Sequence, residues 1–408
     1  MALFRNYNKH HAVPRRELYI PRRTRWAVAL IAVAVIAVCL IVAAFINGWI
    51  TLPEFPSPDT GETAPPVVAE DTVIHITAGG DINITDRVVA SGGANYDYSN
   101  VLRDLMPVLA GADLALANFE GNACGAPYGT KTTSAPTQLL TALQKAGMDV
   151  LQTANSRSVT NGLIGLAATG DSIRAAGMQP LGTYASVEEF EQYGGYLIYE
   201  IKGIRVALVA FTKGMDGRKK PAENCVNLLY TDYTSTYKHI DREGITAILQ
   251  AAEAQKPDIT IAMLHWGGRD SDLLNSSQES VLKLLEEQGV DAVIGTHAHR
   301  VQKMGFRESG MFVSYCLGDL LGDAETTGTR YSVLVDLQIT KDGTTGAVRV
   351  SGYDYIPVYQ DYAEDGSLRL LRIREALTAY ENNYIGAVSE ATYKAMKSAL
   401  SQIDSRVK

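Results

Sequence analysis

The sequence predicts an α/β protein with a largely parallel β-sheet, and two observations lead to this fold class. From residue 72 onward, short apolar runs alternate with amphipathic segments of ten or more residues. Parallel strands need crossover connections of about this length, usually helical, whereas antiparallel strands can be joined by tight turns. The composition of the 408 residues, 46% hydrophobic and 20% charged, is that of a globular protein able to bury a large core.

The predicted elements follow in a regular order. Strands are predicted at 73–78, 114–118, 150–153, 196–201, 206–211, 259–264, 292–294 and 312–316. Helices are predicted at 99–109, 137–146, 163–176, 246–254 and 279–288, and Gly147 and Gly177 are stop signals for two of them. Two strands without an intervening helix follow at 331–339 and 347–358. We therefore expect one large domain at 72–360 and a C-terminal helical segment at 361–408, with helices at 368–379 and 389–403.

The N-terminal region predicts a membrane anchor. Residues 26–46 contain no charged side chain, and about 20 apolar residues of helix span a bilayer core. We predict a transmembrane helix at 26–50, because the run is long for a cleaved signal peptide, the alternative, and no clear cleavage site follows it. The tail 1–25 holds seven basic residues and one acidic residue, whereas acidic residues follow the helix. The N-terminus is therefore expected in the cytoplasm and the bulk of the chain outside the cell membrane. A Pro-rich linker, 51–71, separates helix and domain.

The charge and the cysteines of the chain beyond the predicted membrane helix indicate which partners and which disulfides to expect there. The whole chain has a net charge of −8 and the tail alone has +6, so the remainder carries −14. Such an acidic domain is a poor partner for nucleic acid. Outside the membrane, Cys124 and Cys225 lie in predicted loops and could form a disulfide, or all outer thiols could be free. Cys316 lies in a predicted strand and is expected to be a buried thiol.

Five side chains lie at the carboxyl ends of predicted strands, the edge at which open α/β sheets bind ligands. Asp81 and Glu120 close the first two strands, His265 closes a third, and His297 and His299 follow a fourth. Two residues apart in an extended segment, His297 and His299 would point the same way. Imidazoles and carboxylates together suit a divalent transition metal. The alternatives are structural hydrogen bonding for the histidines, a local turn at Asp81 and a solvated loop acid at Glu120.

Several short motifs give the chain a resemblance to a known family. They are Gly-Asp-Ile-Asn at 80–83, Asn-Phe-Glu at 118–120, Ala-Asn-Ser-Arg at 154–157 with Gly162, Leu-His-Trp-Gly at 264–267, Gly-Thr-His-Ala-His at 295–299 and Tyr-Cys-Leu-Gly-Asp at 315–319. From residue 73 to 323, the chain resembles the CapA family of poly-γ-glutamate capsule synthesis proteins, which looks like a branch of the calcineurin-like metallophosphoesterases.

The resemblance implies a four-layer α/β/β/α sandwich with a centre for two divalent ions, of Mn, Fe or Zn. Asp81 would hold one metal, Glu120 would bridge the two, and the three histidines would complete the ligand shell. Asn83 and Ser156 would be further ligands. His265 and Arg157 are the candidate catalytic residues.

The chain departs from the family pattern around the third motif. Where the family has an amide, a histidine and an acid, this sequence has Ser156, Arg157 and Thr160. Arginine cannot release a proton near neutral pH, so Arg157 cannot replace a general-acid histidine, although its planar fork suits a phosphate or a carboxylate. Arg269 and Asp319 replace a Glu and an Asn of the family.

The family resemblance favours a membrane-anchored protein in the synthesis, export or anchoring of poly-γ-glutamate or a related envelope polymer, working with a membrane-bound polymer synthase. The acidic charge argues against simple electrostatic capture of polyglutamate, so such a role needs a local basic groove or a protein partner. A metal-dependent cell-surface hydrolase of phosphoesters or amides is the second hypothesis. A noncatalytic binding scaffold with an eroded metal site is the third.

Overall fold

The computed structural model describes residues 22–48, 69–384, 386 and 388–408. The chain forms two compact units, Met1–Val67 and Val68–Lys408. In the first unit, helix α1 covers Arg22–Ile46, with side chains described at 31–44 and 46–48. Within the described residues, no helix has both the length and the apolar character needed to cross a membrane. Most of the predicted tail, 1–25, and of the linker, 51–71, lies outside the described residues, and the membrane segment 26–50 stays a prediction.

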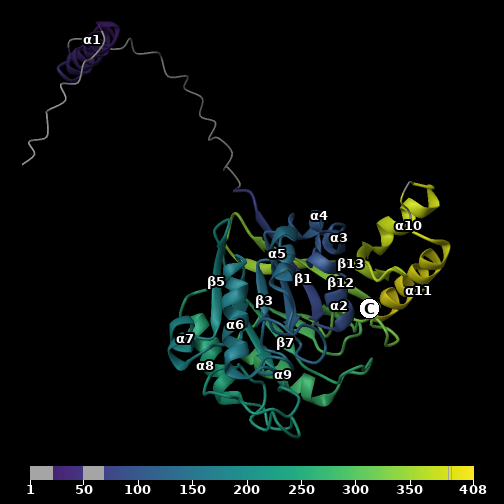
Figure 1. Cartoon of the computed structure of the whole chain (residues 1–408). Helices are drawn as coiled ribbons and strands as arrows, with labels where there is room; N and C mark the ends of the chain where they lie inside the picture. Colours follow the sequence, from purple (N-terminus) through teal and green to yellow (C-terminus); the bar gives the residue numbers. More distant parts are fainter. Residues whose placement is uncertain (1–21, 49–68, 385, 387) are drawn as a thin grey trace, which may run out of the picture. The chain divides into compact units, whose positions relative to one another are not determined.

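The second unit is built around two β-sheets (Figure 1). The first sheet has the strand order β14-β13-β12-β1-β2-β3-β4, and β11 pairs with the end of β1. Strands β1 to β4 run parallel, whereas β12, β13 and β14 form an antiparallel extension. The strands are β1 (Thr72–Asn83), β2 (Leu114–Glu120), β3 (Val150–Gln152), β4 (Gln179–Leu181), β11 (Asp319–Leu321), β12 (Tyr331–Lys341), β13 (Val348–Tyr362) and β14 (Leu368–Arg372).

The second sheet has the order β5-β6-β7-β8-β10-β9, with a parallel centre from β6 to β10 and an antiparallel strand at each edge. Its strands are β5 (Tyr196–Ile201), β6 (Ile204–Thr212), β7 (Ile259–His265), β8 (Ala292–Thr296), β9 (Met304–Phe306) and β10 (Phe312–Ser314). Every residue of β7 and β8 is buried, as expected for parallel strands covered on both faces. The predicted α/β class is confirmed, although each sheet mixes parallel and antiparallel strands.

Helices cover the outer faces of both sheets, and three apolar clusters hold the layers together. One cluster lies between the sheets and includes Ile76, Leu116, Leu208 and Ile261. A second joins the outer face of the first sheet to α3 and α5, and a third joins the outer face of the second sheet to α8 and α9. The helices are α2 (Asp86–Ala90), η1 (Gly93–Asn95), α3 (Ser99–Leu102), α4 (Met106–Leu109), α5 (Thr137–Ala146), α6 (Gly162–Ala175), α7 (Val187–Tyr193), α8 (Arg242–Glu253), α9 (Ser276–Glu287), α10 (Ile373–Glu381) and α11 (Glu390–Arg406).

Two predictions about local structure were wrong. Residues 368–372 are strand β14 and not helix, because Leu368 and Leu370 are buried in alternation with Arg369. The predicted helix 99–109 is split into α3 and α4, with Pro107 in the first turn of α4, where its missing N–H costs nothing. Of the two alternatives left open for the outer cysteines, the structure shows free thiols, because Cys124 and Cys225 do not pair. All four cysteines are free thiols, and Cys316 is buried as predicted.

Candidate metal centre

Six polar side chains meet at the edge where the parallel strands of both sheets end. They form the metal-ligand cluster, which comprises Asp81, Glu120, His265, His297, His299 and Asp319. Asp81 lies near the end of β1, Glu120 and His265 close β2 and β7, the two other histidines follow β8, and Asp319 begins β11. All six side chains belong to buried residues. The strand ends predicted from the sequence are therefore brought together in one place.

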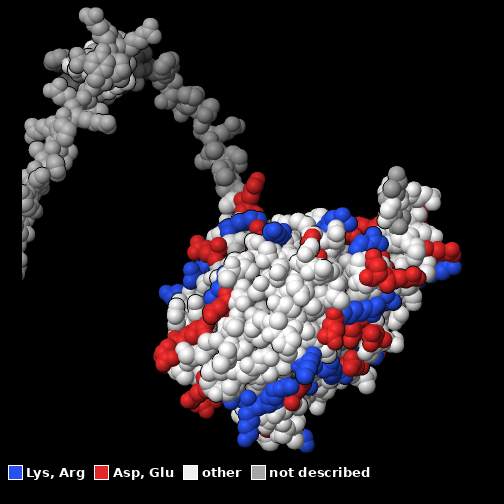
Figure 2. All heavy atoms as spheres, viewed as in Figure 1, with Lys and Arg blue, Asp and Glu red and all other residues white. Residues whose placement is uncertain are grey.

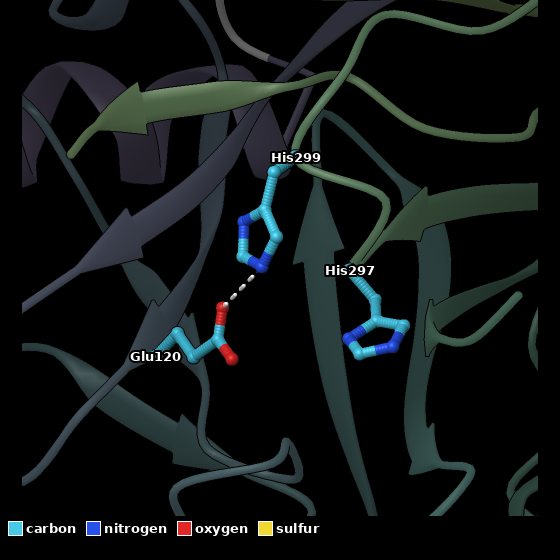
Figure 3. A group of neighbouring side chains, drawn as sticks. All are labelled: Glu120, His297 and His299. Carbon is cyan, nitrogen blue, oxygen red and sulfur yellow. Dashed lines mark ion pairs between the residues drawn. The ribbon is translucent and has the colours of Figure 1, made fainter. Parts of the chain in front are cut away.

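The distances within the cluster suit metal ligation. The Nε2 atom of His265 lies 3.5 Å from Oε1 of Glu120, and Nε2 of His299 lies 3.8 Å from Oε2 of the same carboxylate. Nδ1 of His299 lies 3.6 Å from Oδ2 of Asp81. Three overlapping triads have ligand atoms within 4.8 Å of one another: Glu120 with His297 and His299, Asp81 with His299 and Asp319, and Asp81 with Glu120 and His265. Figure 3 shows Glu120 facing His299, with His297 beside them.

The cluster holds buried polar atoms that no protein group satisfies. Within the described part of the chain, both carboxylate oxygens of Glu120, both ring nitrogens of His297 and the Nε2 atoms of His265 and His299 have no hydrogen-bond partner. Leaving such a group unpaired costs about 1–3 kcal/mol, and more when it is charged. Six such atoms in one small volume fit a divalent cation, which accepts imidazole nitrogen and carboxylate oxygen together.

Two asparagines orient the carboxylate of Asp81. The amide of Asn118 donates to Oδ1 of Asp81 at 2.6 Å, and the amide of Asn155 donates to the oxygen of Asn118 at 3.1 Å. The backbone N–H of His297 donates to the other oxygen of Asp81 at 3.0 Å. These partners leave little freedom to the Asp81 side chain, as is usual for the surroundings of a metal site.

The backbone of the two final histidines is not extended, which corrects the sequence prediction. His297 has φ of 92° and His299 has φ of 56°, both in the left-handed region. The ring of His297 consequently lies closer to that of His265, with centroids 4.4 Å apart, than to that of His299, at 6.0 Å. Both histidines still reach the cluster, but a strained turn and not the strand pleat brings them there.

Burial and neighbouring charges together shift the pKa values of the cluster residues. Burial raises the pKa of Asp81, and the neighbouring Glu120 adds to this rise. Burial also disfavours ionised Glu120, but His299 and His265 outweigh it and lower the pKa of Glu120. Burial lowers the pKa of His297, with help from His265 and the nearby Lys213. Neutral His297 beside ionised Glu120 is the protonation state that metal ligation requires.

Asp319 and His299 form the tightest pair of the cluster. Nδ1 of His299 lies 2.7 Å from Oδ1 of Asp319. Burial opposes the charge of His299, yet Asp319 and Glu120 raise its pKa to about 10. Burial raises the pKa of Asp319 to about 7, although His299 pulls it down. The carboxylate of Asp319 thus favours a hydrogen on Nδ1 of His299.

The other predicted site residues lie around the cluster. Asn83 ends β1, half-buried and in register with Glu120. Ser156 is buried in the loop after β3, beside Asn155. The backbone N–H of Arg157 donates to the side-chain oxygen of Asn155 at 2.9 Å, so the loop that carries Arg157 is tied to the cluster. Metal ligation by Asn83 and Ser156 and catalysis by Arg157 stay predictions.

The sequence did not single out Asp319, Asn118 or Asn155 as site residues. Asp319 stands in the last matching motif, where it was interpreted only as a departure from the family. The available signal was its place after another apolar strand, and the structure pairs it in register with Asp81. Asn118 and Asn155 also lie within the quoted motifs. Their side chains form the hydrogen bonds that orient Asp81.

The fold and the cluster together define a class of α/β proteins that can bind divalent metal where the strands of two sheets end. The sequence model of a family described as "Bacterial capsule synthesis protein PGA_cap" matches residues 75–324, more than half of the chain. The protein belongs to this family, and the predicted resemblance is confirmed.

Two curated relatives and one solved structure illustrate the similarity. Capsule biosynthesis protein CapA of Bacillus anthracis is 25% identical over 295 residues, which cover 70% of this chain and 68% of the relative. PGA biosynthesis protein CapA of Bacillus subtilis strain 168 is 24% identical over 326 residues, covering 76% and 80%. The crystal structure of the calcineurin-like phosphoesterase YfkN from Bacillus subtilis covers 71% of this chain and 91% of its own, with a TM-score of 0.45 and 16% identity.

Proposed function

We propose that this protein is a membrane-anchored, extracytoplasmic component of capsule synthesis that acts in making, exporting or anchoring poly-γ-glutamate or a related envelope polymer. Its domain is a metallophosphoesterase-like four-layer sandwich that holds two divalent ions, of Mn, Fe or Zn. Membership of the capsule synthesis family supports the biological role. The observation that carries the metal centre is the set of buried, unpartnered ligand atoms on Glu120, His265, His297 and His299.

The intact cluster favours a metal-dependent hydrolase as the second candidate function, in preference to a noncatalytic scaffold. Bound divalent ions would supply Lewis acidity for cleavage of a phosphoester or an amide. The chain itself would hold the ions with Asp81, Glu120 and the three histidines. Asn118 and Asn155 would keep Asp81 oriented. Arg157 would position an anionic group of the substrate without donating a proton.

Metal analysis of the purified full-length protein tests the metal centre. We expect two Mn, Fe or Zn ions per chain in the wild type and a reduced content in His297→Ala. His239→Ala is the matched control, because the side chain of His239 is 75% exposed and, among the residues that the structure describes, forms an ion pair only with Asp232. A wild-type protein that binds no divalent metal, and whose stability chelator does not change, would refute the proposed centre.

Capsule measurements in the native host test the biological role. Replacement of the wild-type gene by His297→Ala should change the amount of polymer, or its split between cells and medium, whereas His239→Ala should not. A phosphodiester and a γ-glutamyl amide substrate, assayed with the same pair of variants, test the hydrolase. Normal capsule in a strain that lacks the protein would contradict the assignment.

The proposed anchor predicts a location that cell fractionation can check. The support for it is the uncharged run at 26–46 with its basic N-terminal flank. We expect the protein in the membrane fraction after a high-salt wash, and we expect protease added to intact cells or protoplasts to cleave the domain. Recovery of the whole chain in the soluble cytoplasmic fraction would contradict both the anchor and its orientation.

A further inference from the structure

One ion pair joins the loops of the two sheets beside the metal-ligand cluster. Nη1 of Arg157, in the loop after β3, lies 2.9 Å from Oδ2 of Asp216, in the loop after β6. The side chains are 21% and 38% exposed, so the pair is within reach of solvent. Strand β3 belongs to the eight-stranded sheet and β6 to the six-stranded one. The pair thus crosses from one sheet to the other.

Both ends of this ion pair are fixed to the cluster through short chains of hydrogen bonds. The backbone of Arg157 donates to Asn155, which donates to Asn118, which donates to Asp81. On the other side, the backbone N–H of Lys213, three residues before Asp216, donates to the carbonyl oxygen of His265 at 2.9 Å. Asp216 itself lies in a tight turn, with φ of 51°, followed by Gly217 with φ of 76°.

The guanidinium of Arg157 is only partly satisfied. Its Nε atom is buried and has no hydrogen-bond partner within the described residues. Arginine binds an oxyanion best with two parallel N–H groups of its planar fork. Asp216 reaches Nη1, which leaves Nε as a donor for an incoming anion. In the ligand-free protein, Asp216 therefore satisfies Nη1 of Arg157, whereas Nε still lacks an acceptor.

A second cation, Lys213, lies near the cluster and also near Asp216, the partner of Arg157. Its ammonium donates to the carbonyl oxygen of Gly267 at 2.8 Å and lies 4.8 Å from the centre of the Tyr237 ring. It is close enough to His297 to lower the pKa of that histidine. Two cations close to one metal centre suit a substrate that carries anionic oxygens.

We propose that Arg157 and Lys213 form an anion subsite beside the metal centre, and that Asp216 occupies Arg157 until a carboxylate or phosphate oxygen of the substrate displaces it. This inference rests on the proposed function and names its substrate class, a chain that carries repeated anionic groups. It gives the acidic domain the local basic feature that polyglutamate binding needs. Asp216 also makes the subsite selective, because a weakly anionic ligand cannot displace its carboxylate from Arg157.

Calorimetric titration of the full-length protein tests the subsite with two probes, inorganic phosphate and γ-glutamylglutamate. Asp216→Asn should tighten binding by roughly two- to fivefold, the range expected when a partly exposed ion pair no longer competes. Arg157→Gln should weaken binding by about tenfold or more, as expected for loss of a charge-assisted hydrogen bond. Asp361→Asn is the matched control and should change nothing, because Asp361 forms a similar pair with Arg369, at 2.8 Å, between β13 and β14.

Each result of the titration either supports or overturns the anion subsite. Unchanged affinity in Arg157→Gln, or unchanged or weaker binding in Asp216→Asn, would overturn the subsite. If Arg157→Gln does not fold, Arg157→Lys takes its place, since lysine keeps the charge but lacks the fork and should also bind more weakly. The probe that binds tighter identifies the anion as carboxylate or phosphate. Metal content of the same samples separates the two proposals, because a metal-free wild type contradicts the centre while the affinity order still reports on Arg157.

Discussion

The contact between Asp319 and His299 shows how one residue can fix the orientation of a metal ligand. The carboxylate accepts a hydrogen bond at Nδ1 of His299, so the lone pair of the neutral ring lies on Nε2, the atom that faces Glu120. A carboxylate behind a ligating histidine is a common arrangement, and its loss costs about 10–100-fold in metal affinity. Asp319 is therefore a positioning residue of the proposed centre.

Substitution of Asp319 separates its acceptor role from its charge. Asp319→Leu should reduce metal affinity about 10–100-fold, whereas Asp319→Asn keeps an acceptor oxygen and should lose only a small part of this. Competition with a chelator of known affinity measures both. Asp171→Leu is the control, because the Asp171 side chain is 82% exposed on α6. Equal affinity in Asp319→Leu and the wild type would show that His299 needs no partner.

Gly80 allows the close approach of β1 to the segment before β11. A Cβ atom at this position would lie 1.8 Å from the carbonyl oxygen of Gly318, which accepts the N–H of Asp81. Gly80→Ala should lower the free energy of unfolding by about 3 kcal/mol or more, because backbone on both sides would have to move. Urea denaturation measures this change.

Gly170, inside α6, is the matched comparison. The nearest atom to an added Cβ there is the flexible end of Arg174, at 3.3 Å. Gly170→Ala should stabilise the protein by about 0.5–1 kcal/mol, the usual gain for alanine within a helix. Similar small effects for Gly80→Ala and Gly170→Ala would contradict the tight contact at Gly80.

At the scale of elements, four aspartates fix the register of the parallel strands at the edge opposite the metal centre. Each precedes a strand, and each exchanges two hydrogen bonds with one residue of the neighbouring strand. The N–H of the aspartate donates to the carbonyl oxygen of that residue, and its carboxylate accepts the N–H, at distances between 2.7 and 3.0 Å. The pairs are Asp113 with His75, Asp149 with Ala115, Asp258 with Arg205 and Asp291 with Thr260.

Because these aspartates titrate, we expect the free energy of unfolding to depend on pH. Burial raises the folded-state pKa of Asp291 above its ordinary value of 3.8, so the folded protein binds this proton more tightly than the unfolded chain does. The carboxyl group therefore contributes more stability as the pH falls through its raised pKa toward 3.8. The stability of the wild type relative to Asp291→Asn, which cannot titrate, should rise over this window in urea titrations.

Asp113 should show the opposite sign. Burial would raise its pKa, but hydrogen bonds from Lys202 and from His75 prevail and lower it. Its contribution is present above the unfolded-state pKa and is lost as the pH falls through the depressed folded-state value. The stability of the wild type relative to Asp113→Asn should therefore fall at acidic pH. Parallel curves for Asp113→Asn and Asp291→Asn would contradict this account.

Sequence patterns could predict most elements because burial of strands and helices has a clear periodicity. The buried, mostly apolar runs of β7 and β8 and the amphipathic helices α5, α8 and α9 were found in this way. Elements of three residues, such as β4 and β11, are too short for a period to show. Strand β14 was missed because the Leu-rich run at 368–371 fits both helix and strand, and only its pairing with β13 decides.

The site could be predicted to a similar depth. Strand ends gave Asp81, Glu120 and the three histidines, because the edge of a parallel sheet collects whatever follows its strands. The contacts of Asp319 and the pair of Arg157 with Asp216 could not be predicted, since each joins segments from different parts of the chain. The distances between loops depend on how the two sheets pack.

At the scale of the whole molecule, the acidic net charge does not describe every part of the surface. Figure 2 shows basic side chains gathered toward the lower edge of this face, acidic ones toward its sides, and a broad area without charged side chains over α5 and α6. A domain with this distribution can repel polyanions at long range and still bind an anionic group locally. Specific recognition then depends on contacts such as those of Arg157.

The C-terminal helices are part of the domain core. Met396, Ala399 and Ile403 of α11 belong to the buried apolar cluster that lies between the two sheets. The end of α11 also reaches the loop after β7, where Nη1 of Arg406 lies 3.1 Å from Oδ1 of Asp272. Asp272 in turn lies 3.4 Å from Arg300, the residue after His299. The C-terminus thus supports the loops around the metal centre.

Truncation of one buried side chain on α11 tests this integration. Ile403 is completely buried, so Ile403→Ala should lower the free energy of unfolding of the domain by about 2–5 kcal/mol, the usual cost of such a cavity. Ser401→Ala, at an exposed position of the same helix, should leave it unchanged. Urea denaturation followed by tryptophan fluorescence reports on the domain, because Trp266 is buried next to His265. If Ile403→Ala unfolds at the wild-type urea concentration, α11 contributes nothing to the core and must be a separate arm.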